Sequence, residues 1–133
     1  MEEWTRWQPS KNLPGKYYLT SWSWPQEGLL IELSSEKRGQ KIQLLFDGTI
    51  GSFRYTNESF CFNVFGKLSK KYGGDFYQDW SFFKINNSEY LKWMVENSDE
   101  WADKFDFVHF CIIGGDEMID IIANDEPKVK IIK

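Results

Sequence analysis

The pattern of apolar and polar residues in the first half of the chain is typical of β-strands. Of four short stretches, the first and third divide their side chains between two strand faces, and the second is a short apolar run. The predicted strands are Lys16 to Trp24, Leu29 to Leu33, Lys41 to Phe46 and Ile50 to Thr56. Short polar turns separate them, and Asp47-Gly48 is a strong hairpin signal. We therefore expect an antiparallel meander, preceded by an irregular segment with several prolines from Trp4 to Pro14.

The period then changes to that of a helix. From Glu58 to Lys71, apolar residues recur at i, i+3, i+4 and i+7, which predicts one helical face turned toward a core. Ser59 is the candidate cap, and Gly66 is unfavourable because glycine loses more backbone freedom than other residues. A strand is predicted next, over Gln78 to Asn86.

A second helix is predicted from Glu89 to Asn97. Asn87 or Ser88 can cap it, because short polar side chains accept hydrogen bonds from the first turn. Its apolar stripe consists of Tyr90, Trp93 and Met94, widened by Leu91 and Val95. Residues 98–104 are expected to form a loop or a short helical turn.

The most apolar part of the chain predicts a hairpin, with arms from Phe105 to Ile113 and from Asp116 to Ala123 around Gly114-Gly115. Both faces of the first arm are apolar, so it is expected to be a central strand covered on both sides. A two-residue turn would pair Ile113 with Asp116 and place His109 opposite Asp120. We interpret His109 and Asp120 as a buried hydrogen-bonded pair that fixes the strand register.

These elements define the fold class. Lys128 to Ile132 alternates as a last strand, and its lysines are typical of a sheet edge. The chain of 133 residues has no repeat, linker or low-complexity stretch. We predict a single α+β domain over 1–133, with a mostly antiparallel sheet of seven or eight strands and about two helices packed on one face.

Composition adds limits on location and partners. No apolar run approaches the length of a membrane span, and the N-terminus has no apolar signal segment, so a cytoplasmic protein is expected. Aromatic residues make up 18% of the chain, more than a small core can hide. Some of them are therefore expected at the surface, where tryptophan and tyrosine favour interfaces or ring-stacking sites.

Charge is unevenly distributed. The whole chain carries −4, but residues 97–126 contain Lys104 as their single base and nine acidic groups. An acidic domain repels phosphate backbones, so nucleic acid is not expected as a ligand. The acidic segment suits a basic protein partner, and the alternative is a solvated face that keeps the protein soluble.

The sequence contains no familiar catalytic or metal-binding set. One histidine and two separated cysteines do not make a zinc site, and no calcium loop, phosphate loop or nucleophile elbow is present. We therefore predict no metal, no cofactor and no enzymatic activity. An enzyme using His109, Asp120 and Cys111 is a weaker alternative, because all three residues are predicted to lie in the core.

The last half of the chain resembles a group of small bacterial proteins. The similarity rests on Asn87-Ser88-Glu89-Tyr90-Leu91-Lys92-Trp93, Val108-His109-Phe110-Cys111-Ile112-Ile113, Met118-Ile119-Asp120-Ile121-Ile122-Ala123 and Glu126-Pro127. Some proteins of this group look like immunity proteins of polymorphic or contact-dependent toxin systems. The resemblance implies a cytoplasmic inhibitor, monomeric or dimeric, that binds one toxin domain.

These observations together favour a non-catalytic protein-binding module, most concretely an immunity or antitoxin-like protein. Its acidic face would meet a basic toxin domain and speed their encounter. The predicted contact residues are Asp99, Glu100, Asp103 and Asp106, with Trp101 as an aromatic anchor. The alternative is a small-ligand or carbohydrate-binding domain in which Trp22 and Trp24 line a groove.

Overall fold

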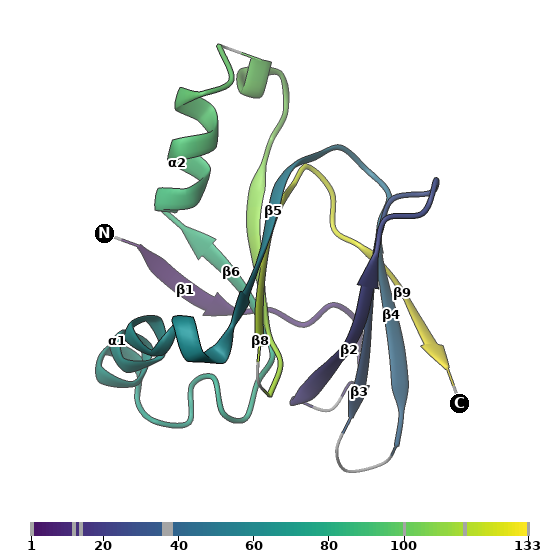
Figure 1. The fold of residues 1–133 in the computed structure, drawn as a ribbon, viewed down its shortest axis with the longest axis vertical. Coiled ribbons are helices and arrows are strands. Elements are labelled where there is room, and N and C mark those ends of the chain that lie inside the picture. The colour runs from purple at the N-terminus through teal and green to yellow at the C-terminus, as the bar shows by residue number, and fades with distance from the viewer. Residues whose placement is uncertain are drawn as a thin grey trace.

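The computed structural model describes residues 2–11, 13, 15–35, 39–99, 101–115 and 117–132, except for the side chain at position 58. Within these residues, nine strands form two antiparallel sheets, and two α-helices and two short 3-10 helices complete the fold. Figure 1 shows the two sheets side by side and the helices on one flank. The predicted α+β class is confirmed, with the strands divided between two sheets.

One sheet has five strands among the described residues, in the order β1-β6-β7-β8-β5. Their bounds are β1 Glu3–Arg6, β5 Ile50–Asn57, β6 Phe82–Asn86, β7 Val108–Ile113 and β8 Glu117–Ala123. The predicted central strand is β7, whose residues from His109 onward are all buried. We call this the five-stranded sheet.

The other sheet has four strands in the described part of the chain, in the order β2-β3-β4-β9. They are β2 Tyr17–Ser23, β3 Leu29–Ser35, β4 Lys41–Phe46 and β9 Lys128–Ile132. Burial alternates strictly along β3, so one face of this strand is covered. The last strand lies at an edge, so the prediction made from its lysines is confirmed.

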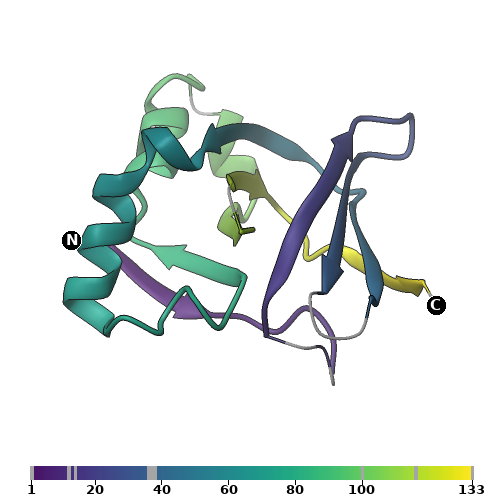
Figure 2. The ribbon, with the colours of Figure 1, turned by 60° about the horizontal axis from the view of Figure 1, so that its bottom comes forward.

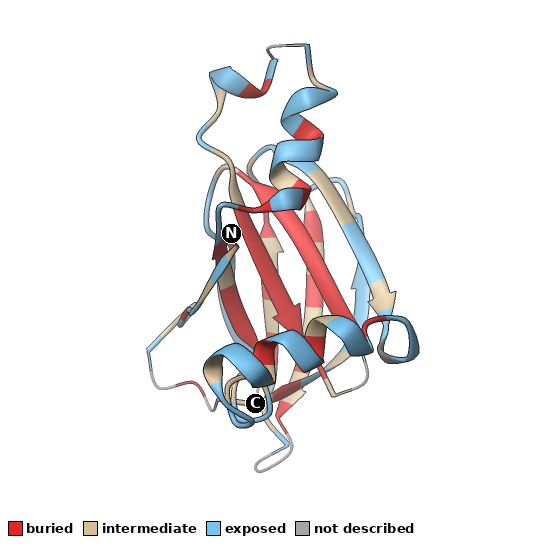
Figure 3. Ribbon diagram, turned by 90° about the vertical axis from the view of Figure 1, so that its left-hand side faces the viewer, coloured by how far each residue is buried: buried red, intermediate tan, exposed pale blue. Residues whose placement is uncertain are grey.

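The helices cover the side of the five-stranded sheet that faces away from the four-stranded sheet (Figure 2). A 3-10 turn, η1 Glu58–Phe60, leads into α1 Phe62–Tyr72, and α2 Glu89–Glu96 is followed by η2 Trp101–Lys104. Figure 3 shows α1 and α2 lying over opposite ends of the buried strands. Ser88 caps α2 by accepting a hydrogen bond from Leu91 N at 2.9 Å, as predicted.

Three apolar clusters hold these layers together. The largest lies between the two sheets and includes Tyr17, Phe46, Phe82 and Phe110. The second lies beneath α1, and the third, smaller one lies beneath α2. Because β7 and β8 contribute side chains to clusters on both of their faces, they are the most buried part of the fold.

The predicted hairpin at Asp47-Gly48 is wrong. Strand β4 pairs with β3 and β9, whereas β5 pairs with β8 in the other sheet. Asn124 explains why the chain does not fold back: its side-chain oxygen accepts from Thr49 N at 2.8 Å, and its own N–H donates to Thr49 O at 3.2 Å. These bonds tie the segment after β4 to the β8–β9 turn.

The predicted register of the central hairpin is also wrong. Ile113 pairs with Met118, so His109 lies opposite Ile122 and Cys111 opposite Asp120. The turn lies one residue later than predicted: Gly114 N donates to Glu117 O at 2.8 Å, so positions 114 and 117 face each other with two residues between them; Asp116 lies outside the described residues. Strand β2 packs closely against this turn, and a Cβ on Gly115 would lie 2.2 Å from the Tyr18 ring. Only glycine therefore fits at position 115.

Three smaller predictions need correction. The segment predicted to be irregular begins with β1, which adds to the edge of β6 because the Trp4 ring packs on Phe83 at 5.7 Å. The N-cap of α1 is Cys61, whose side chain makes no capping bond to the helix, and not Ser59. The strand predicted from position 78 begins only at Phe82, after a series of turns.

Candidate functional site

The helix-covered face of the five-stranded sheet carries a polar row between its two apolar clusters. This row consists of Arg54 on β5, Asp120 on β8, His109 on β7 and Ser88 at the start of α2. Ser88, His109 and Asp120 are each 2% exposed or less. Polar groups buried this deeply are stable only when their hydrogen bonds are made. We call these four residues the polar network.

The network is connected without a break. Arg54 Nε donates to Asp120 Oδ2 at 2.9 Å, and His109 Nε2 lies 2.7 Å from Asp120 Oδ1. The other ring nitrogen, His109 Nδ1, lies 2.6 Å from Ser88 Oγ. His109 and Asp120 therefore make contact although the predicted register is wrong, because their side chains meet diagonally across the two strands.

The donors and acceptors of the network match when the histidine ring is neutral. An ionised carboxylate only accepts hydrogen bonds, so Nε2 of His109 carries the proton that faces Asp120. Nδ1 then accepts from the Ser88 hydroxyl, whose oxygen accepts from Leu91 N of α2. The capping bond of α2 is thus linked through one ring to the centre of the sheet.

Neighbouring groups set the ionisation of Asp120. Burial by itself would raise the pKa of this carboxyl, but the hydrogen bonds from His109 and Arg54 and the positive charge of Arg54 outweigh it and lower the pKa below its usual value. Burial and the nearby Asp120 carboxylate raise the pKa of the Cys111 thiol well above its ordinary value. Cys111 is therefore a protonated thiol at neutral pH and a poor nucleophile.

A serine, a histidine and an aspartate in hydrogen-bonded series resemble a hydrolase triad, but this arrangement differs in two respects. The Ser88 hydroxyl is buried and already caps a helix, so a substrate has no access to it. Its partner on the ring is Nδ1, the nitrogen that binds the aspartate in the serine proteases. The geometry suits a structural link between α2 and the sheet.

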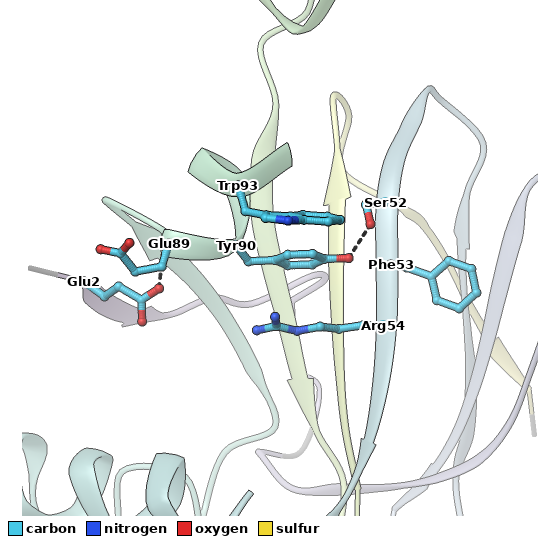
Figure 4. Close-up of a pocket in the computed structure, with 7 residues that line it drawn as sticks. All are labelled: Glu2, Ser52, Phe53, Arg54, Glu89, Tyr90 and Trp93. Atoms are coloured by element: carbon cyan, nitrogen blue, oxygen red, sulfur yellow. Dashed lines mark hydrogen bonds between the residues drawn. The ribbon is translucent and has the colours of Figure 1, made fainter. Parts of the chain in front are cut away.

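An open pocket of about 610 Å³ lies beside the network, between α2 and β5. Figure 4 shows three planar groups stacked along it: Trp93, Tyr90 and the Arg54 guanidinium. The Arg54 carbon Cζ lies 4.1 Å from the Tyr90 ring centre, and the Tyr90 and Trp93 rings are 5.9 Å apart. The Tyr90 hydroxyl is 2.5 Å from Ser52 Oγ, which fixes the middle of the stack.

Two carboxylates lie on the other side of this pocket. Glu2 Oε2 accepts from Glu89 N at 2.8 Å, so the N-terminal segment supports the first turn of α2. Glu89 itself lies 3.8 Å from Lys92. Arg54, the single cation among the described residues that line the pocket, is already paired with Asp120. The lining therefore favours planar or cationic groups over anions.

The predicted contact residues lie at the end of the molecule formed by α2 and η2. Asp99, Asp103 and Asp106 are exposed, and the Trp101 side chain is 63% exposed. Lys104 Nζ lies 4.1 Å from the Trp101 ring centre and covers one part of it. Glu100, the remaining predicted contact residue, lies outside the described residues.

Two further exposed apolar side chains of α2 belong to this end, and the sequence did not identify them. Trp93, predicted as part of the buried stripe, is 55% exposed and stacks on the outside of Tyr90. Val95 is also exposed. The buried stripe is narrower than predicted and consists of Tyr90 and Met94. We call Trp93, Val95, Asp99, Trp101, Asp103 and Asp106 the acidic end.

Trp22 and Trp24 are exposed at the other sheet. Their rings pack on Phe53 of β5, at centroid distances of 5.2 and 5.4 Å, so they form one cluster across the edges of the two sheets. Figure 4 shows Phe53 pointing away from Tyr90 and the pocket beside it. A carbohydrate site on these rings stays a prediction.

Among the described residues, no three histidine, cysteine or acidic side chains come together as a metal would require. No helix within the same residues has the length and apolar character to cross a lipid bilayer.

Comparison with known proteins gives no relative from which a function can be carried over. No protein-family model, no curated protein and no solved structure matches this chain.

Proposed function

We propose that this chain is a non-catalytic protein-binding module whose contact surface is the acidic end. The observation that carries this proposal is the exposure of two tryptophans among acidic side chains: Trp93 and Trp101 are both more than half exposed. Exposed tryptophans at the rim of a small domain are costly in water and are frequent anchors of interfaces.

Acidic residues near Trp101 give this surface its negative charge. Asp99 precedes the ring, and Asp103 and Asp106 follow it on the same short segment. Lys104 lies against the ring, but the acidic residues outnumber it, and an excess of one charge around an aromatic anchor accelerates encounter with a surface of opposite charge and disfavours wrong partners. The expected partner is therefore a protein domain with a basic surface.

The position of the acidic end also supports a binding role. Figure 1 shows α2 and η2 projecting beyond the ends of the strands, where a partner meets them without disturbing either sheet. The polar network anchors α2 to β7 and β8 through Ser88 and His109. A rigidly held helix loses little conformational entropy when it binds.

Within this class, the particular function that we propose is that of an immunity or antitoxin-like protein. Such a protein would bind one toxin domain, cover its basic substrate cleft and prevent substrate entry. The small size, acidic surface and exposed aromatic anchors agree with this role. The proposal includes no catalytic step, since the polar side chains that resemble a triad are buried and committed to structure.

The test begins with the tagged full chain as bait in lysate of its own organism, at low and at high salt. A single basic protein that is retained at low salt and released by salt is the expected result. Its purified domain then serves for binding kinetics. An empty bait at both salt concentrations counts against the proposal.

Substitutions connect such binding to the acidic end. Trp101→Ala should weaken affinity by roughly 30-fold, mainly through faster dissociation, as expected for a central anchor. Asp103→Lys should slow association and flatten its salt dependence. Asp75→Lys is the matched control, because Asp75 is exposed beyond the other helix, α1. Equal binding by Asp103→Lys, Asp75→Lys and the native chain would remove the acidic end from the interface.

A further inference from the structure

A second pocket lies at the opposite end of the sandwich from the acidic end. Figure 1 shows α1 and the beginnings of β2 and β8 meeting at this end. The pocket has a volume of about 520 Å³, which is within the usual range for small-molecule sites. Its walls include Lys16, Tyr18, Phe62, Phe65, Gly66 and Tyr77. We call it the Lys16 pocket.

Among the described residues that line this pocket, Lys16 is the single cation. Its Nζ donates to two backbone carbonyls, Tyr77 O at 2.7 Å and Ile113 O at 3.3 Å. An ammonium group has three N–H donors, so one remains for a further acceptor. No described carboxylate lies within 4.0 Å of Nζ as an ion-pair partner.

The pKa of Lys16 is set mainly by its burial. Burial lowers its pKa to about 8, and the negative charge of Asp79 opposes the shift only in part. The other titratable groups that line the pocket are the phenols of Tyr18 and Tyr77. From α1, the pocket is lined by Phe62, Phe65, Gly66 and Ser69, none of them charged.

Gly66 shapes the α1 wall of this pocket. A glycine inside a helix costs about 1 kcal/mol relative to alanine. Neither backbone nor packing requires it here: its φ is not positive, and a Cβ would meet nothing within 4 Å. What its missing side chain provides is open space on the α1 wall of the pocket.

The rest of the lining is aromatic. Phe65 and Tyr77 stack on each other with ring centres 4.9 Å apart, and Tyr18 and Phe62 are exposed side chains of the same pocket. Aromatic walls around one ammonium group suit a monoanion with an apolar body. A phosphate dianion would need more donors than the single free one of Lys16.

We propose that the Lys16 pocket binds a small carboxylic acid with an apolar body, its carboxylate on Lys16 Nζ and its body between Phe62 and the ring of Tyr77. The same chemistry occurs in free aromatic acids and in the C-terminal carboxylate of a peptide that ends in an apolar residue. This site is separate from the acidic end and does not depend on the function proposed for that surface.

Calorimetric titration of the full chain tests the proposal with four probes. Phenylacetate and N-acetyl-phenylalanine carry the carboxylate, and phenylacetamide and N-acetyl-phenylalanine amide are their neutral counterparts. Backbone amide NMR shifts locate the binding. We expect shifts at Gly66, Gly114 and Gly115, which line the pocket, and at least tenfold weaker binding of both amides.

Two substitutions change residues on different walls of the Lys16 pocket. Lys16→Met removes the charge, and Gly66→Leu fills the pocket from a position with free space, so each should reduce binding at least tenfold. Lys70→Met, on α1 but outside this pocket's lining, should leave binding unchanged. Amide spectra of each variant confirm that it is folded.

The pH profile provides a further readout. Both probe acids stay ionised between pH 6.5 and 9, so within the carboxylate–Lys16 pair the charge changes at Lys16 as the pH rises through about 8. With that pKa, affinity at pH 9 should be about tenfold weaker than at pH 6.5. The Lys70→Met variant should show the same profile.

The results distinguish a peptide C-terminus from a free acid and can also overturn the proposal. Tighter binding of N-acetyl-phenylalanine supports a peptide C-terminus as the natural ligand, and tighter binding of phenylacetate supports a free acid. Equal affinity for acid and amide, undiminished binding by folded Lys16→Met, or no pocket shifts at millimolar probe would each overturn the proposal.

Discussion

Replacing Asp120 by asparagine tests whether the polar network holds the molecule together. The side chain keeps its shape but loses its charge, and one of its two oxygens becomes an NH2 donor. In the native chain, Oδ1 accepts from His109 at 2.7 Å and Oδ2 accepts from Arg54 at 2.9 Å. An asparagine can satisfy only one of these donors, and its own NH2 then faces the other.

The size of the effect follows from burial. Removing one partner of a buried ion pair costs about 3–5 kcal/mol, because the other charge is left in a poorly solvated site. His109 is buried, but the Arg54 side chain is 51% exposed and regains hydration from water. We therefore expect Asp120→Asn to lower the free energy of unfolding by about 2–3 kcal/mol, which corresponds to roughly 6–12 °C in Tm.

The same reasoning predicts a pH dependence. The pKa of Asp120 is lower in the folded protein than the ordinary value of 3.8. Its ionised form therefore stabilises the fold fully above pH 3.8, and this stabilisation is lost as the pH falls through the lower, folded pKa. The difference between the native chain and Asp120→Asn should shrink in acid, because the native carboxylate is then protonated as well.

Urea unfolding monitored by tryptophan fluorescence, at pH 7 and in steps down to pH 3, measures both effects. Asp47→Asn is the control: Asp47 also pairs with a cation, Lys128 at 2.7 Å, but at the surface. Its substitution should have a much smaller effect. A change below about 0.5 kcal/mol at pH 7 for Asp120→Asn, or an equal change for both variants, would refute a stabilising role of the network.

Three other substitutions or reactions probe the same structure. Ser88→Ala should cost about 2 kcal/mol in urea unfolding, because it removes the cap of α2 and the donor facing His109 Nδ1; a cost of only the ~1 kcal/mol of an ordinary cap would show that the ring contact adds nothing. Both thiols, Cys61 and Cys111, should resist labelling by a maleimide until the protein unfolds, since both are buried; rapid labelling of native Cys111 would contradict its raised pKa. Gly66→Ala should raise the unfolding free energy by up to about 1 kcal/mol, and a loss of stability would mean that its free space is needed for packing.

Local sequence signals predicted most of the secondary structure. The strand patterns of β3 and β4 depend only on residues near one another in the chain, and so does the cap signal at Ser88. The structure agrees with these predictions. The apolar character of β7 on both faces also predicted its central place, because only a covered strand can bury both sets of side chains.

Local sequence signals did not predict which strands pair with each other. Asp47-Gly48 is a good turn by itself, but the bonds of Asn124 to Thr49, 75 residues away, send β5 to the other sheet. The register of β7 and β8 depends similarly on Tyr18, whose ring lies against Gly115 of their turn. Such choices depend on which long-range packing buries more surface, and this is not encoded within one segment.

For the candidate sites too, some features follow from the sequence and others only from the tertiary structure. The sequence by itself determined the acidic segment with Trp101 and the closeness of His109 to Asp120, because the residues concerned lie within one loop or one hairpin. Only the tertiary structure decided that Arg54 and Ser88 complete the polar network, that Trp93 is exposed, and that Gly66 opens a pocket beside Lys16. These features join elements that are distant in sequence, and the physical reason is that burial and hydrogen bonding act between whichever surfaces the folded chain brings together.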